Sequence, residues 1–289
     1  MRQENPVFWY HLLGQSRYRW RKQRAMTIIA SVLIGLLYLY LLQQTLEYEV
    51  EPILIQLLGL LLICLLIPLG SYSLFSAEYE KATWESLAIT PLTVDQIVFG
   101  KWFSRVLGVL VVVLIMTPLS FVAWLKSFRV EAGLLGWLGS QWMLLSWGVL
   151  LVSLGMWLSF RVRHSIASAA LLYGIQVFVL LFLPLLVYTL FSLAVTGTYL
   201  ENPFRYRLPG EPSWGDRLWF WLSLPFDWRC VFWLNPYLSM EPILTTYSSE
   251  QARLLRELGF GWGQGLYYGF FSWLLYWFTR QGVRRHWRK

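Results

Sequence analysis

Six long apolar segments dominate the sequence and restrict what the chain can fold into. They cover residues 25–42, 53–75, 98–125, 134–160, 166–190 and 260–279. Each is long enough to cross about 30 Å of hydrocarbon as a helix, which takes roughly 17 to 25 residues. A soluble domain of 289 residues that are 57% hydrophobic would have more apolar surface than its core could bury. The sequence therefore predicts an all-α, polytopic membrane protein with six transmembrane helices, forming a single transmembrane domain over residues 1–289.

The distribution of Lys and Arg predicts the orientation of these spans. If residues 1–24 are cytosolic, sixteen of the 24 Lys and Arg fall on the cytosolic side, and most of the others lie in one long external loop. Cytosolic flanks of membrane helices carry such an excess. We therefore expect both ends, including a basic tail over residues 280–289, to be cytosolic in a bacterial plasma membrane. The net charge of +8 then reflects topology and contact with anionic lipids, not nucleic-acid binding.

The N-terminal stretch, residues 1–24, has the composition of a helix that lies in the plane of the lipid headgroups. Asn5 and Pro6 suit the cap and first turn of a helix. Aromatic and basic side chains then alternate along it, as expected at a membrane surface. The membrane-surface candidates are Trp9, Arg17, Arg19, Trp20, Arg21, Lys22 and Arg24. The alternative is a basic flank that only fixes orientation.

The longest connection, residues 191–259, is rich in Trp and Pro and contains too many charges for another span. We expect it to be an external loop with short interfacial helices, because its Trp side chains suit the membrane surface. A role in receiving or gating a substrate is the alternative.

Ionisable side chains are missing from the middle of all six predicted spans. Lys101 and Arg105 come closest, and we expect their long side chains to reach the cytosolic interface. Proton-coupled carriers and intramembrane enzymes usually need such a group at depth. The three His and two Cys, Cys64 and Cys230, do not approach metal-ligand spacing or suggest a disulfide framework. We therefore predict no catalytic residue and no metal site on this chain.

A charged segment, residues 76–93, separates the second and third spans. Its sequence SAEYEKATWESLAITPLT places Glu78, Lys81 and Glu85 on one face of a helix, with Glu78 and Lys81 spaced to pair. Pro91 disfavours helix at the preceding residue and so ends this helix. Thr93 and Gln96 form a capping box that begins the next one. The result is a short cytosolic helix followed by a sharp corner.

This segment resembles the loop between spans two and three of the permease subunits of type 2 ATP-binding-cassette (ABC) exporters. The family pattern E-x-E-x-x-T-x-E-x-L-x-x-x-P-L followed by I-x-x-G-K is present here as Glu78, Glu80, Thr83, Glu85, Leu87, Pro91, Leu92, Ile97, Gly100 and Lys101. Two weaker similarities accompany it. The basic N-terminal stretch resembles the elbow helix of these permeases, and LNPYLSM (residues 234–240) resembles a segment ahead of their last span.

The resemblance implies that the charged segment is a coupling helix docked on a cytosolic ABC ATPase subunit. The residues implied in coupling are Glu78, Glu80, Lys81, Thr83, Trp84, Glu85, Leu87, Thr90, Pro91 and Leu92. ATP and Mg would be held by the ATPase subunit, since this sequence has no G-x-x-x-x-G-K-[ST] phosphate loop. A second permease subunit, identical or related, would complete the transporter. Many family members have Gly where this chain has Ala82, from which we expect a somewhat stiffer helix.

Small residues and prolines give the remaining packing clues. Gly261, Gly265 and Gly269 recur every four residues in the sixth span, and Ala170 and Gly174 do so in the fifth. Such spacing lets helices approach closely, either within one bundle or between two chains. Three prolines, Pro68, Pro118 and Pro184, should bend their spans and free backbone carbonyls.

The sequence therefore predicts a permease subunit of an ABC exporter, with ATP hydrolysis on a separate subunit. The alternative is a membrane anchoring or assembly protein that recruits a cytosolic partner without moving cargo. Uncharged, aromatic-rich spans favour an amphipathic cargo, such as a lipid, a lipid-linked glycan, a hydrophobic peptide or a drug.

Overall fold

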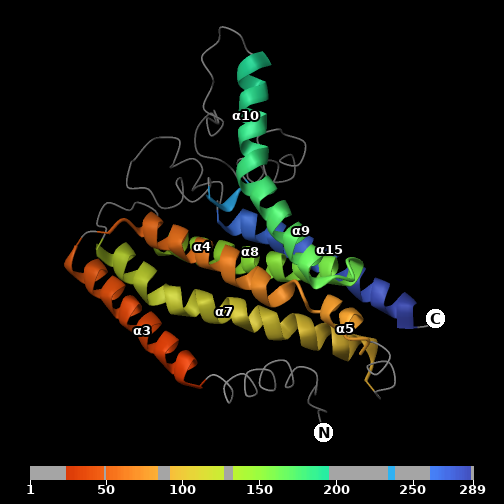
Figure 1. The fold of residues 1–289 in the computed structure, drawn as a ribbon. Coiled ribbons are helices and arrows are strands. Elements are labelled where there is room, and N and C mark those ends of the chain that lie inside the picture. Colours follow the sequence, from red (N-terminus) through yellow and green to blue (C-terminus); the bar gives the residue numbers. More distant parts are fainter. Residues whose placement is uncertain are drawn as a thin grey trace.

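The computed structural model describes residues 24–48, 50–83, 92–126, 133–194, 234–237 and 261–287 (Figure 1). Within these ranges the regular structure is entirely helical. The long helices are α3 (Arg24–Glu47), α4 (Pro52–Ser71), α7 (Val94–Lys126), α8 (Gly133–Arg161) and α15 (Trp262–Trp287). A short helix, α5 (Ser76–Glu80), follows α4 after a turn. The predicted all-α class is confirmed.

The predicted fifth span is built from three consecutive pieces. α9 (Ser165–Val177) leads into η2 (Phe178–Phe182), a π-helical segment, which leads into α10 (Leu183–Ala194). Pro184 lies in the first turn of α10, where it lacks the N–H that an α-helix needs. The π-helical segment ends two residues before this proline, and most of α10 extends away from the bundle (Figure 1).

Four of the predicted spans lie in helices that are long and apolar enough to cross a membrane. These candidate spans are Pro52–Glu80, Val94–Lys126, Leu134–Arg161 and Ser165–Val187. The other two predicted spans coincide with α3 and α15, helices of 24 and 26 residues. That α3 and α15 also cross the membrane stays a prediction.

The core of the bundle is formed by α4, α7, α8 and α15, with α8 at its centre because it contacts the other three and α9. Buried side chains from all four helices meet, among them Leu60, Val113, Trp147 and Tyr268. α3 lies against α7 (Figure 1) and exposes most of its apolar side chains. Exposed Leu, Ile and Val side chains on α3, α7 and α9 are what lipid-facing surfaces require.

Two helices end at other residues than the predicted spans do. The second span was expected to remain helical to residue 75, but α4 ends at Ser71 and a turn covers residues 72–75. The sixth span was expected to end at residue 279 and to be followed by a basic tail, but α15 continues to Trp287. Arg280 and Arg284 bind Asp95 of α7, which holds these last turns of α15 against the bundle.

Candidate functional site

The candidate site is the end of the bundle where α5, the start of α7, the start of α9 and the end of α15 gather (Figure 1). Five of the predicted coupling residues lie in the described ranges: Glu78, Glu80, Lys81, Thr83 and Leu92. The other five, Trp84, Glu85, Leu87, Thr90 and Pro91, lie outside them, as do the membrane-surface candidates at positions 9–22 and the side chain of Arg24.

The start of α5 is capped by a side chain from α8. The N–H groups of Phe75 and Ser76 donate to the Oγ atom of Ser159, at 2.7 and 2.9 Å. α5 has no side-chain cap at Phe75, the residue that precedes it. Ser159 therefore supplies the acceptor that helix N-termini need, and it fixes the charged segment to the central helix of the bundle.

The end of α5 is closed by a Schellman motif. The N–H of Thr83 donates to the Glu78 carbonyl at 3.0 Å, and the N–H of Ala82 donates to the Tyr79 carbonyl at 3.2 Å. In this motif the penultimate residue adopts the left-handed conformation, usually as Gly, and Ala82 has a φ of 51°. The expectation of a stiffer helix at Ala82 was wrong, because α5 ends at Glu80 and Ala82 turns the chain.

Replacing Ala82 by Gly should stabilise the protein by about 1 kcal/mol, because the left-handed conformation costs an L-residue roughly 1–2 kcal/mol and costs Gly almost nothing. Thermal unfolding in detergent measures the effect. The matched control is Ala77→Gly inside α5, which should be destabilising. An equal loss of stability from both glycines would contradict the assigned motif.

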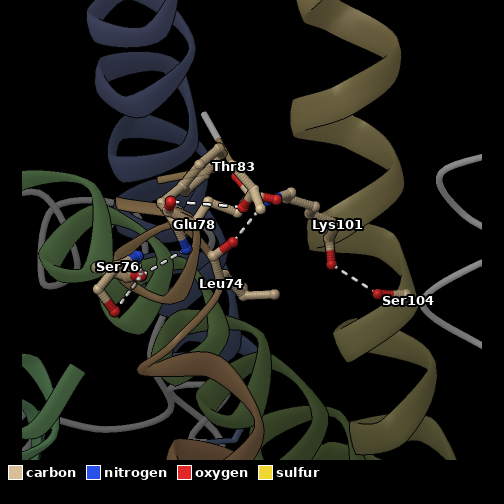
Figure 2. A network of polar contacts seen from close by, with 8 residues as sticks. Leu74, Ser76, Glu78, Thr83, Lys101 and Ser104 are labelled. Atoms are coloured by element: carbon tan, nitrogen blue, oxygen red, sulfur yellow. Dashed lines mark hydrogen bonds and ion pairs between the residues drawn. The ribbon is translucent and has the colours of Figure 1, made fainter. Parts of the chain in front are cut away.

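Lys101 of α7 is completely buried at this end of the bundle. Its ammonium donates to the Leu74 carbonyl at 2.6 Å and pairs with the Glu78 carboxylate (Figure 2). It also lies 4.4 Å from the centroid of the Phe75 ring, a cation–π distance. One expectation was therefore wrong: Glu78 pairs with the buried Lys101 and not with Lys81. Buried charges require partners of this kind.

Glu80 points to a different helix. Its Oε1 atom accepts the backbone N–H of Ser165 at 2.7 Å, and its Oε2 atom accepts the Ser165 hydroxyl at 2.7 Å. Ser165 is the first residue of α9, and His164 before it gives no side-chain cap. A carboxylate at this position satisfies a free N–H and complements the helix dipole. Glu80 therefore connects the charged segment to the fifth span.

The start of α7 is joined to the end of α15. The predicted capping box is confirmed: the Thr93 N–H donates to the Gln96 side chain at 2.9 Å, and the Gln96 N–H donates to the Thr93 hydroxyl at 3.3 Å. Asp95 accepts two hydrogen bonds from Arg280, at 2.7 and 2.6 Å, and one from Arg284 at 2.7 Å. Two-point Arg–carboxylate contacts fix geometry, so the two helix ends are held in register.

Two carbonyls that prolines leave without their helical partner are bound by amide side chains from elsewhere. The N–H of residue 68 would bind the Cys64 carbonyl, and that of residue 184 the Leu180 carbonyl, but both residues are Pro. Gln176 of α9 donates to the Cys64 carbonyl at 3.1 Å. Asn235, from the LNPYLSM segment, donates to the Leu180 carbonyl at 2.9 Å.

These two contacts partly confirm the prediction that the prolines free carbonyls. Sequence reasoning missed these partners. A Gln side chain within an apolar span, such as Gln176, is a signal for a buried hydrogen bond of this kind. The same holds for Gln56 and Gln141 at the opposite end of the bundle. Gln141 donates to the Gln56 side chain and to the Ser120 hydroxyl, and Gln56 donates to the Ser140 hydroxyl. Each amide joins two or more helices.

The predicted packing residues divide into two groups. Gly265 lies against Trp142 of α8, where an added Cβ would come within 2.3 Å of the indole, and Gly261 has a φ of 88° against the Gly139 backbone. Gly269 and Gly174 have no described atom within 4 Å of such a Cβ, and Ala170 is exposed. The first group serves packing within the bundle, and the second leaves contact with another chain open.

The described residues offer no metal site, since they contain no group of three His, Cys, Asp or Glu side chains that could hold an ion. The one cysteine among them, Cys64, is buried and unbridged. The polar contacts of the site attach the charged segment to three helices: to α8 through Ser159, to α7 through Lys101 and to α9 through Ser165.

The comparisons with known proteins agree with this description. Residues 21–220 match the family model described as ABC-2 family transporter protein. A search of curated proteins finds no match for the chain. The family match covers more than half of the sequence and includes α3 to α10 together with the charged segment. The chain belongs to the ABC-2 family of transporter proteins and is an integral membrane permease subunit of an ABC transporter.

Proposed function

We propose that this permease forms the translocation pathway of an exporter and that its charged segment docks on a separate cytosolic ABC ATPase. The observation that carries the proposal is the attachment of the charged segment to the bundle. Ser159 caps its start, Lys101 holds Glu78, and Ser165 holds Glu80. A segment that only separated two spans would not need polar bonds to three helices.

The internal contacts refine where an ATPase would bind. The Glu78 side chain is only 17% exposed and is turned towards Lys101. Glu80 is exposed, but both of its oxygens are used by Ser165. We therefore place the principal docking contacts after Thr83, on Trp84, Glu85 and Leu87, with Glu78 and Glu80 positioning the segment. ATP and Mg belong to the partner subunit.

The transport cycle requires a difference in binding energy. Two permease subunits, identical or related, would assemble with two ATPases in the plasma membrane of a bacterium, with both termini in the cytosol. ATP-bound ATPases must bind one arrangement of the permease pair more tightly than the other, because equal affinity for both would shift nothing. The pathway would then open alternately to the inner and outer sides for an amphipathic cargo.

The test is ATP turnover by the reconstituted complex in lipid vesicles. Glu85→Arg should weaken the ATPase contact by at least about tenfold, because a like-charge contact at an interface costs several kcal/mol, and should reduce permease-dependent hydrolysis accordingly. The matched control is Glu51→Arg. It makes the same charge reversal directly before α4, away from the charged segment, and should leave hydrolysis unchanged.

The alternative function, an anchor that recruits a cytosolic partner without transport, predicts a different result. An anchor should leave ATP turnover the same with and without the permease, and with either charge reversal. Such a flat response would contradict the proposed function.

A further inference from the structure

The two acidic residues of the E-x-E pattern point to opposite sides of α5. Residues two positions apart on a helix are separated by about 200° around its axis and do not face each other. Glu78 accordingly binds Lys101 of α7, and Glu80 binds Ser165 of α9. α5 therefore lies between the third and fifth spans and holds both.

We propose that Glu80 is a positioning residue that transmits movement of the charged segment to α9, so that α9, η2 and α10 follow the segment when the ATPase subunits bind ATP. The inference rests on the proposed function and adds a defined path within the chain. It concerns the fifth span, which is eighty-five residues from Glu80 in the sequence.

The contact is suited to transmit orientation as well as position. Both carboxylate oxygens are bound to one residue, through its N–H and its hydroxyl. The N–H is one that no residue inside α9 can bind, since the first N–H groups of a helix lack intrahelical partners. The Ser165 hydroxyl also lies 3.1 Å from the Ser76 hydroxyl, so the first residues of α5 and α9 are in direct contact.

The fifth span is less fixed by the bundle core than α4, α7, α8 and α15 are. α8 is packed against α4, α7 and α15, whereas α9 contacts α4, α5 and α8 and continues into α10, which stands apart (Figure 1). Exposed apolar side chains cover much of α9 and η2, including Ile166, Leu171 and Phe178. The π turn and Pro184 interrupt regular α-helical bonding between α9 and α10. The α9 helix buries only Ser168, Leu172 and Gln176, so a displacement at Ser165 can move α9 relative to α4 and α8.

The experiment measures the distance between α9 and α7 in the full complex with its ATPase subunits. Spin labels are placed at Ala170→Cys and Leu110→Cys, both exposed positions, in a Cys230→Ser background. Cys64 is 2% exposed and should not be labelled. Distance distributions are recorded with and without ATP under conditions that trap the ATP-bound state.

The variants separate positioning from stability. In the unmodified chain, and in the control Glu51→Ala before α4, ATP should shift the α9–α7 distance. Glu80→Ala, measured in complexes that were purified with their ATPase subunits bound, should lose the shift. Glu80→Gln keeps an acceptor for the Ser165 N–H and should retain part of the ATP-dependent shift. Ser165→Ala, which keeps the backbone N–H, should behave in the same way as Glu80→Gln.

Two results would overturn the inference: an undiminished ATP-dependent shift in Glu80→Ala, or no shift in the unmodified complex while it hydrolyses ATP. Failure of the unmodified chain to bind any ATPase is a different result, and it would contradict the proposed function itself.

Discussion

Replacing Glu78 by Leu should lower the free energy of unfolding by about 3–5 kcal/mol, because it leaves the charge of Lys101 buried without a carboxylate. Lys101 is fully buried, so water cannot replace the lost partner. The remaining contacts, the Leu74 carbonyl and the Phe75 ring, are neutral. Thermal unfolding in detergent, followed by intrinsic Trp fluorescence, measures the loss.

The companion variants test whether the effect comes from the pair. Lys101→Met alone should cost less, since Glu78 is 17% exposed and retains some access to water. The double variant Glu78→Leu/Lys101→Met should recover most of the stability, because two apolar groups then replace a buried ion pair. If the losses of the two single variants simply added in the double variant, the pair would not be the source.

Replacing Asn235 by Leu should cost about 1–3 kcal/mol, the penalty for leaving a buried carbonyl without a donor. Asn235 is 1% exposed, and its side chain binds both the Leu180 carbonyl and the Tyr237 N–H. The loss should be local, so hydrogen exchange should accelerate in η2 and the first turn of α10 more than in α8. Mass spectrometry of peptides from these helices measures the difference.

A second substitution serves as the control. Pro184→Ala restores an N–H four residues after Leu180, which can bind the freed carbonyl in a regular α-helix. Asn235→Leu should therefore cost much less in a Pro184→Ala background. An unchanged cost would mean that Asn235 stabilises the protein through its other contacts, and the assigned link between Asn235 and Pro184 would be wrong.

The helices could be predicted from the sequence because apolar runs of span length leave few alternatives in a membrane. Each of the six predicted segments lies largely in helix, and the capping box at Thr93 and Gln96 follows from local spacing alone. The carbonyls freed by Pro68 and Pro184 also follow from local chemistry. These features depend on residues that are neighbours in the chain.

The contacts that define the site could not be predicted, because each depends on a partner distant in sequence. The burial of Lys101 could not be predicted, because its carboxylate partner, Glu78, lies 23 residues earlier in the chain. The cap that Glu80 gives to Ser165 depends on how α5 and α9 pack. The left-handed conformation of Ala82 could not be predicted, because the residue that usually adopts it is Gly.

The E-x-E pattern acquires a physical meaning from these contacts. Spacing of two on a short helix directs the carboxylates to opposite sides, so one acid serves α7 and the other α9. The pattern thus holds α5 between two spans. This agrees with the proposal that the residues after Thr83 make the principal contacts with the ATPase.

We propose that this permease carries a separate ABC ATPase on its charged segment. The most direct measurement is to purify the chain from its native membrane in mild detergent and to identify co-purifying proteins by mass spectrometry, with Glu85→Arg as the paired sample. We expect a protein with a phosphate-binding loop to co-purify in stoichiometric amount with the unmodified chain and to be lost in Glu85→Arg. Recovery of the chain without any such protein, under conditions that keep other membrane complexes intact, would contradict it.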